Sequence, residues 1–365
     1  MITVKNKSDL FIICGERSGD LHGSELVKQL LEINPKIKIH CWGGELMKGS
    51  GAKLIEDYSS YSIMGFIEVL KKALFLYNKI QKCKSDILKL NPKRVLLIDF
   101  PGFNLRIAKF CKENKIDVDY LIPPKTWAWN SGRNLTLKKN INNIYSILPF
   151  EKKYFQKEGV EVNYIGNPLI NRIKKNRIKK NRNYIGLFPG SRASEIKYSL
   201  PIFIELIEDL DNENFIVFGV SNLINSSYDM ISKYANVKMV FDDTYGSLNR
   251  CKYAVVMSGT ASLEVALLKV PHVVVFKASS ISYFIAKLLV KLKFYSLVNI
   301  IMEKEVVKEL IQDKFNFKNI LNELDYLKKD KFQKKMVKDF KDLRSRIGEL
   351  NSSEKLAKII YEKIL

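Results

Sequence analysis

The sequence predicts an α/β protein made of two doubly wound domains, each with a parallel sheet covered by helices on both faces. A buried-strand run, a glycine-rich turn and a helical pattern recur in the N-terminal half, and the same succession restarts after residue 183. Strands that alternate with helices indicate parallel sheets. The 365 residues, 46% of them hydrophobic, also exceed what one compact core usually holds.

The first domain is expected over residues 1–170, with a helix in 345–365 returning to it. It opens with a strand, a turn at Gly15–Gly19 and a helix from about Asp20 to Ile33 that Ser18 or Asp20 would cap. A second helix is expected over Leu105–Asn114. The expected strands of this half are Leu10–Cys14, Lys38–Trp42, Arg94–Asp99 and Val118–Ile122.

The second domain is expected over residues 184–344. Between the domains, the basic segment 171–183 is predicted to be a solvated linker, with a polyanion-binding patch as the alternative. In such a pair of sheets we expect a ligand cleft where the carboxyl ends of the strands face each other. The expected strands of this half are Tyr184–Phe188, Phe215–Gly219, Tyr253–Met257 and His272–Phe276.

Composition narrows the class of protein. The net charge of +22 favours nucleic acid, anionic lipid or phosphorylated substrates as partners, the alternative being a lysine-rich chain with no polyanion partner. The five cysteines form no C-x-x-C pair, so we expect reduced thiols and no metal cluster. The N-terminal apolar stretch is too short for a signal peptide, and no run of about 18 apolar residues occurs. We therefore expect an intracellular protein, soluble or attached at a membrane surface.

The first turn, GERSGDLHG from Gly15, is not the G-x-G-x-x-G of dinucleotide-binding proteins. Its glycines would let a substrate approach the backbone, and the helix N-terminus would offer free N–H groups. Glu16, Asp20 and His22 place two acids and an imidazole in one short turn, although a purely structural turn is the alternative.

Asp99 follows a hydrophobic strand, where a carboxylate points into the cleft of an open α/β sheet. It could serve there as a general base, or it could cap the next helix.

Two turns of the second domain suit a nucleotide. Pro189-Gly190-Ser191-Arg192 opens a helix, and its amides and guanidinium suit a pyrophosphate, although it is not a Walker A loop. In the segment 258–264 (SGTASLE), small residues and hydroxyls could bind phosphate and Glu264 could hold a ribose diol. Plain helix starts are the alternative for both. The sequence has no histidine cluster and no Asp-x-Asp motif of the kind that metal-dependent sugar transferases use, which predicts that no metal is used.

Two apolar stretches, 61–80 and 281–292, have lysines beside them. They are either buried helices or helices that dock on anionic lipid. The Trp127-Ala128-Trp129 loop either packs in the core or lines an acceptor site.

Taken together, the ordered blocks GERSGDLHG, MGFIEVL, IDFPGFN, WAWN, ILPFEKKYF, YIGNPL, LFPGSRASEI, SGTASLEVAL, LVNII and ELIQ resemble the lipid-A-disaccharide synthases. The resemblance implies a glycosyltransferase B fold, with two Rossmann-like domains facing a central cleft. It also implies an inverting transfer, without metal or cofactor, from UDP-2,3-diacylglucosamine to 2,3-diacylglucosamine 1-phosphate (lipid X), which yields lipid A disaccharide 1-phosphate and UDP. Implied partners are these lipids, the anionic cytoplasmic face of the inner membrane and, as in some members of the family, a second copy of the chain, with no specific nucleic acid.

The resemblance also assigns roles by position. Asp99 matches the candidate base, and His22 could share that role. The acceptor loop is matched by Glu16, Ser18, Gly19 and Asp20. The UDP-binding positions are Gly190, Ser191, Arg192, Ser258, Gly259, Thr260, Ser262, Glu264, Asn299 and Gln312.

Two rival functions stay open. One is another UDP-N-acetylglucosamine enzyme on the same fold, a 2-epimerase or a relative of the peptidoglycan glycosyltransferase MurG. The other is a non-catalytic basic protein that binds membranes or nucleic acid, for which steeply salt-dependent DNA binding without UDP affinity would be the evidence.

Overall fold

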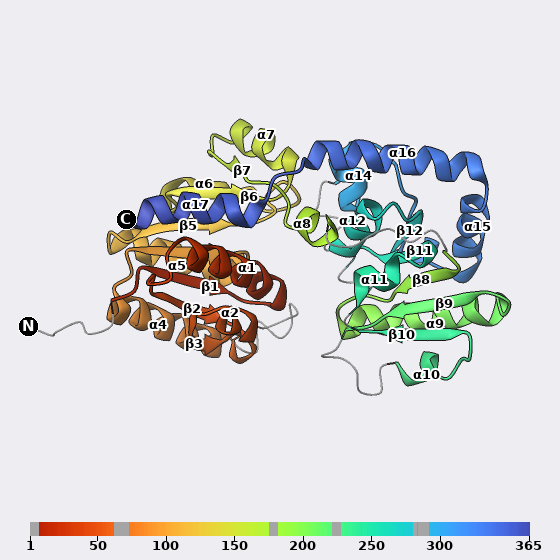
Figure 1. Ribbon diagram of the computed structural model, residues 1–365, viewed down its shortest axis with the longest axis horizontal. Coiled ribbons are helices and arrows are strands. Elements are labelled where there is room, and N and C mark those ends of the chain that lie inside the picture. Colours follow the sequence, from red (N-terminus) through yellow and green to blue (C-terminus); the bar gives the residue numbers. More distant parts are fainter. Residues whose placement is uncertain are drawn as a thin grey trace, which may run out of the picture. The chain divides into compact units, whose positions relative to one another are not determined.

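The computed structural model describes residues 7–61, 73–174, 182–220, 228–241, 243–279, 283 and 292–365. The chain divides into two compact units (Figure 1). Unit 1 contains Met1–Pro168 and Leu350–Leu365, and unit 2 contains Leu169–Glu349. Residues 345–349, expected with the first domain, therefore belong to unit 2.

Unit 1 is built on a parallel sheet of order β3-β2-β1-β4-β5-β6-β7. Its strands are β1 (Leu10–Cys14), β2 (Ile39–Gly43), β3 (Lys53–Asp57), β4 (Arg94–Ile98), β5 (Asp117–Leu121), β6 (Asn143–Ser146) and β7 (Asn163–Tyr164). Its helices are α1 (Arg17–Ile33), α2 (Glu45–Gly49), the 3-10 turn η1 (Tyr58–Ser60), α4 (Ala73–Leu90), α5 (Pro101–Glu113), α6 (Arg133–Asn140), α7 (Pro149–Lys157) and α17 (Ser352–Ile364).

Both faces of this sheet are buried because alternate residues of its central strands point to opposite sides. Phe11 and Ile13 belong to a core with residues of α4 and α5. Leu10 and Ile12 belong to a second core with residues of α1 and α17. A strand buried on both faces has no polar positions, which is why Leu10–Cys14 is wholly hydrophobic.

Unit 2 repeats the plan with a parallel sheet of order β10-β9-β8-β11-β12-β13. Its strands are β8 (Tyr184–Phe188), β9 (Asn214–Phe218), β10 (Val237–Val240), β11 (Cys251–Met257), β12 (His272–Phe276) and β13 (Glu309–Ile311). Its helices are α8 (Leu169–Lys174), α9 (Ala193–Asp209), α10 (Asp229–Ser232), α11 (Thr244–Leu248), α12 (Thr260–Leu267), α14 (Leu297–Met302), the 3-10 turn η3 (Gln312–Lys314), α15 (Phe317–Leu327) and α16 (Asp330–Ile347).

Each sheet has a point where the strand order reverses. In unit 1 it lies between β1 and β4, whose last residues Cys14 and Ile98 are paired. In unit 2 it lies between β8 and β11, where Phe188 pairs with Val256. Crevices at such points bind ligands in open α/β sheets, so the loops after these four strands are where a site is expected.

The predicted doubly wound α/β class is confirmed. All the strands expected from the sequence are present, with ends that differ by up to two residues. Strands β3, β6, β7, β10 and β13 had not been expected. β7 and β13 are very short, and β3 is only partly buried and carries three charged residues, so none shows a hydrophobic run.

The chain returns to unit 1 through α17. This helix packs against α1, with Leu356, Ala357 and Ile360 buried in the same core as Leu26. Lys93 also donates to the carbonyl of Ile364 over 2.7 Å. The C-terminal segment is therefore an integral part of unit 1.

Several expectations fall on residues outside those described. These are residues 62–72 of the first apolar stretch, most of the 281–292 stretch, and residues 175–181 of the basic segment. Among the helices that are described, none is long and apolar enough to span a bilayer.

Candidate active site

The loop after β1 packs closely against the loop after β4. A Cβ atom on Gly15 would lie 2.3 Å from the ring of Phe100, and one on Gly19 would lie 2.7 Å from the Cβ of Cys14. Both positions therefore need glycine. The half-buried Glu16 follows Gly15, and the hydroxyl of Ser18 donates to its carboxylate.

Asp20 has a different role from the one expected of it. Its side chain is buried, and its carboxylate accepts hydrogen bonds from the backbone N–H groups of Gly44, Leu46 and Met47 at 2.9–3.1 Å. It therefore caps α2 rather than α1, which begins earlier, at Arg17, with no side-chain cap. We reassign Asp20 from substrate binding to positioning the loop after β2.

Asp99 lies at the end of β4 in a left-handed backbone conformation, with φ of +46°. Phe100 follows in the same region, so the chain turns sharply into α5. Asn104 and Tyr120 hold this turn by donating to the Asp99 carbonyl over 2.7 and 2.6 Å. The Asp99 carboxylate accepts from the N–H of Phe100 over 2.8 Å. Non-glycine residues in this region are uncommon, and they concentrate at functional sites.

The surroundings of Asp99 raise its pKa to about 6. Burial has the largest effect, and the negative charge of Glu16 adds to it, whereas Lys125 and the Phe100 N–H oppose it. A carboxyl group with this pKa is largely ionised at neutral pH and can still accept a proton, which suits a general base.

Sequence reasoning missed two charged residues near Asp99, namely Lys125 and Glu151. Glu151 is 3% exposed and accepts a hydrogen bond from the indole N–H of Trp127 over 2.9 Å. Burial raises its pKa to about 7, and the charge of Asp99 contributes to the increase, while Trp127 and Lys125 oppose it. Glu151 lies inside the block ILPFEKKYF and Lys125 lies two residues before WAWN, but only the adjacency of β4, β5 and β6 brings them together.

His22 lies half-buried on α1. The hydrogen bonds described for Asp99 come from Phe100, Asn104 and Tyr120. The sharing of the base role by His22 stays a prediction.

In unit 2, the loop after β8 carries Gly190, with φ of +115°, where a Cβ would lie 2.5 Å from that of Glu195. Glu195 accepts from the N–H groups of Ser191 and Arg192 over 2.8 and 3.3 Å. The Arg192 guanidinium lies 3.1 Å from the same carboxylate, and its side chain is 61% exposed. An exposed guanidinium beside a helix N-terminus is available to an anionic ligand.

The loop after β11 lies on the adjacent strand end. Gly259 and Thr260 are exposed, and a Cβ on Gly259 would meet nothing within 4 Å. The hydroxyl of Ser258 donates to the Tyr295 carbonyl over 3.2 Å. One turn into α12, burial raises the pKa of Glu264 to about 7, and Arg172 opposes the increase.

Three residues expected at the UDP site are occupied by contacts within unit 2. The Asn299 amide donates to Val307 and Glu309 and accepts from the N–H groups of Val306 and Val307. Gln312 bonds the N–H and carbonyl of Ala278, and Ser262 bonds the hydroxyl of Ser296 at 3.0 Å.

Glu309 connects these contacts to Tyr295, whose carbonyl accepts from Ser258 in the loop after β11. It accepts from the N–H groups of Tyr295 and Ser296 at 2.8–3.1 Å. We therefore expect Asn299, Gln312 and Ser262 to position the loops rather than to touch the nucleotide.

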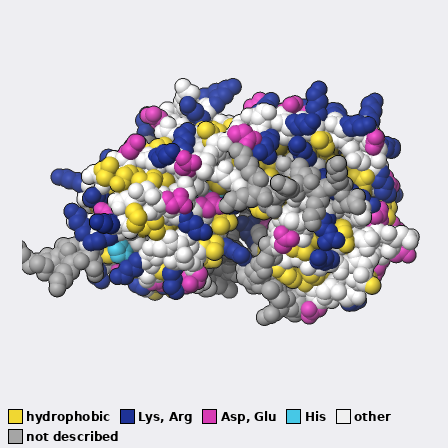
Figure 2. Space-filling view, in the orientation of Figure 1, with side chains coloured by type: hydrophobic (Ala, Val, Ile, Leu, Met, Phe, Trp, Pro, Cys, Tyr) yellow, Lys and Arg dark blue, Asp and Glu magenta, His cyan; other side chains and the backbone are white. Residues whose placement is uncertain are grey.

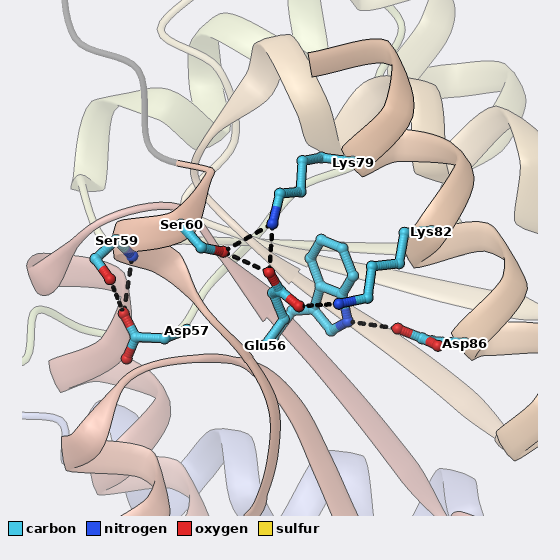
Figure 3. Close-up of polar contacts among 8 residues, drawn as sticks. Glu56, Asp57, Ser59, Ser60, Lys79, Lys82 and Asp86 are labelled. Atoms are coloured by element: carbon cyan, nitrogen blue, oxygen red, sulfur yellow. Dashed lines mark hydrogen bonds and ion pairs between the residues drawn. The ribbon is translucent and has the colours of Figure 1, made fainter. Parts of the chain in front are cut away.

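A separate ionic cluster lies at the outer edge of the unit 1 sheet (Figure 3). Glu56 of β3 accepts from Lys79 over 2.5 Å, and also from Lys82, both on α4. These bonds hold the pKa of Glu56 at about 2, although burial opposes them. Beside it, the Trp42 indole donates to Asp86 over 3.2 Å. The cluster ties α4 to the sheet and supplies no group to the Asp99 site.

In the part of the chain that the structure describes, no three His, Cys, Asp or Glu side chains are grouped so that they could hold a metal ion.

Comparison with known proteins now bears on these two strand-end sites. The family model described as lipid-A-disaccharide synthetase matches residues 10–361. The chain belongs to the lipid-A-disaccharide synthase family. Relatives of that name include one from Geobacter metallireducens, 31% identical over 100% of this chain and 99% of the relative, and one from Syntrophus aciditrophicus, 32% identical over 96% and 97%. The chain is therefore a glycosyltransferase of lipid A biosynthesis.

Solved structures confirm the glycosyltransferase B type of fold. UDP-GlcNAc 2-epimerase from Neisseria meningitidis, bound to UDP-GlcNAc, has a TM-score of 0.67 at 15% identity and covers 97% of this chain and 99% of its own. A glycosyltransferase from Rickettsia africae has a TM-score of 0.53 at 14% identity over 98% and 99%. At such identities the likeness concerns the fold alone.

Proposed function

We propose that this synthase transfers a 2,3-diacylglucosaminyl group from its UDP derivative to the 6-hydroxyl of 2,3-diacylglucosamine 1-phosphate. The products are UDP and a β-1,6-linked disaccharide 1-phosphate. The observation that carries the proposal is the placement of Asp99, a carboxylate with a raised pKa in a strained turn at the strand-order reversal of unit 1. The family membership of the chain supports the choice of substrates.

In the proposed reaction, Asp99 accepts the proton of the acceptor hydroxyl while the hydroxyl oxygen forms a bond to C1 of the donor sugar. The C1–O bond to the diphosphate breaks, and UDP leaves with the electron pair. Attack from the side opposite to the leaving group inverts the configuration at C1. Burial and, second to it, the negative charge of Glu16 keep the proton affinity of Asp99 high, and general base assistance of this kind contributes about 10²–10⁴-fold.

The donor nucleotide is proposed to bind at the reversal point of unit 2. Gly259 leaves room for phosphate oxygens near the backbone, and the hydroxyl and amide of Thr260 can bind them. Arg192 would turn from Glu195 to the diphosphate and stabilise the charge that develops as UDP leaves. Glu264 is proposed to accept from the ribose hydroxyls.

We also propose that the protein works at the anionic cytoplasmic surface of the inner membrane. At the start of α4, Leu74 is 74% exposed and Tyr77 is 58% exposed, and Phe75 lies beside Lys79. Apolar side chains next to lysines suit an anionic lipid surface. Lysine and arginine are also spread widely over the face shown in Figure 2. Replacing Leu74 and Tyr77 with serine should reduce flotation with anionic vesicles while leaving the melting temperature unchanged.

The decisive experiment supplies both lipids in detergent micelles and identifies the products by mass spectrometry and NMR. The proposal requires UDP release, a disaccharide 1-phosphate and a β anomeric linkage. UDP-N-acetylglucosamine without acyl chains should not react. Its conversion to the C2 epimer, with no disaccharide from the lipids, would instead identify a 2-epimerase.

A further inference from the structure

Three cations near Asp99 have no carboxylate partner in the described part of the chain. Arg106 lies on α5 and donates to the Gly102 carbonyl of its own helix. Lys125 is exposed in the loop after β5. Arg133 begins α6, and its guanidinium lies over the ring of Trp129, 4.7 Å from the centroid.

Arg133 is the most informative of the three because it is only partly exposed. Burial and the positive charge of Arg106 both lower its pKa, so the two guanidinium groups repel each other. Elsewhere the chain neutralises a buried guanidinium, since Arg94 pairs with Asp117 and Asp119 at 2.8 Å each. A partly desolvated cation beside another cation is costly unless an anion joins them.

The three cations lie in the segments that follow β4 and β5, as Asp99 does. Helices α5 and α6 pack against each other. The Tyr120 hydroxyl donates to the Asp99 carbonyl. The positive charge of Arg133 is close enough to that hydroxyl to lower its pKa, although burial raises the pKa overall. The positive charge of Lys125 lowers the pKa of both Asp99 and Glu151, although the described contacts include no ion pair between Lys125 and either carboxylate. The cations therefore lie near the candidate base but do not neutralise it.

We propose that Arg133, Arg106 and Lys125 bind the phosphate of the acceptor sugar. This inference rests on the proposed function, and it assigns a subsite to a group that the base does not touch. The phosphate is on C1 and the reacting 6-hydroxyl is on the carbon attached to C5, and these two ring carbons flank the ring oxygen. A cation cluster near Asp99, but not bonded to it, can therefore meet the phosphate while Asp99 meets the hydroxyl. Guanidinium groups suit this role because their parallel N–H groups bind two phosphate oxygens together.

The test compares two acceptors, 2,3-diacylglucosamine 1-phosphate and 2,3-diacylglucosamine without the phosphate, in steady-state assays with one donor. The wild-type protein should prefer the phosphorylated acceptor. In Arg133→Gln, KM for that acceptor should rise by about 10- to 100-fold, the value of one hydrogen bond to a charged group. The donor KM should stay within about twofold, and Arg133→Lys should recover part of the loss.

A matched control is Lys84→Gln. Lys84, on α4, is also a partly buried cation over an aromatic ring. Its ammonium lies 5.2 Å from the ring centroid of Phe110, which is in the C-terminal part of α5. Lys84→Gln should leave the KM for both acceptors unchanged. Should Arg133→Gln fold poorly, Arg106→Gln and Lys125→Gln remove exposed side chains and should each weaken the preference for the phosphorylated acceptor.

The outcomes separate the two claims. Equal losses on both acceptors in every variant would show a structural role for the cations and overturn the subsite. Wild-type protein that uses both acceptors equally would overturn it as well. Failure of the wild-type protein to form disaccharide from either acceptor would instead reject the proposed function on which the subsite depends.

Discussion

Asp99→Asn would remove the base while keeping the contacts of the turn. Asparagine tolerates the left-handed conformation that Asp99 adopts, and its amide oxygen can still accept the Phe100 N–H, which donates over 2.8 Å in the wild-type protein. Turnover should fall by about 10²–10⁴-fold, the usual contribution of a general base. The assay is UDP release at saturating donor and acceptor.

The pH dependence gives a second readout. Because the pKa of Asp99 is about 6, about nine-tenths of the carboxylate is ionised at pH 7 and about one tenth at pH 5. The wild-type kcat/KM should therefore decrease about tenfold per pH unit below 6. The residual activity of Asp99→Asn should lack this decrease.

Stability should change in the opposite direction to activity. The pKa of Asp99 rises from 3.8 to about 6 on folding, so its ionisation opposes folding fully above pH 6 and not at all below about pH 4. At 1.36 kcal/mol per pKa unit the penalty at pH 7 is at most about 3 kcal/mol. Asp99→Asn should therefore raise the free energy of unfolding by about 1–3 kcal/mol at pH 7, measured with urea, and the gain should vanish near pH 4.

Asp57→Asn is the matched control, because Asp57 also ends a strand and accepts a nearby backbone N–H, that of Ser59 over 2.9 Å. It should leave turnover and its pH dependence unaltered. A folded Asp99→Asn protein with wild-type turnover would refute the assignment of the base. So would a variant that keeps the same decrease in activity below pH 6.

The remaining predictions concern the structure that holds the sites. Glu56→Gln should lower the free energy of unfolding by about 2 kcal/mol at pH 7 in urea titrations, because ionised Glu56 stabilises the fold through its bonds to Lys79 and Lys82. This loss should shrink as the pH falls from 4.5 towards the Glu56 pKa of about 2. Gly190→Ala should lower the melting temperature because of its φ of +115° and the nearby Glu195. Gly259→Ala, where space is open, should keep the melting temperature but raise the Kd for UDP measured by calorimetry. Ile360→Ala should cost about 2–5 kcal/mol of unfolding free energy, since the side chain is fully buried between α17 and α1, and an unchanged denaturation midpoint would contradict that packing.

The sequence by itself determined the class of fold and the places where chemistry is expected. Strands buried on both faces must be hydrophobic throughout, so Leu10–Cys14 and Tyr184–Phe188 were predicted with the bounds that the structure has. Glycines at close approaches mark the turns, and the turn at Asp99 was predicted from its position after a hydrophobic run. These signals are local, so they can be recognised from neighbouring residues in the sequence alone.

Only the tertiary structure decided which side chains meet. The Asp20 carboxylate accepts hydrogen bonds from N–H groups at the start of α2, and the Asn299 amide oxygen accepts from the Val306 N–H. Buried polar groups need such partners, and the fold decides which ones lie within reach. Lys125 and Arg133 lie near Asp99 because β5 pairs with β4. The order of strands in a sheet depends on how whole helices cover its faces, and no single stretch of sequence encodes that order.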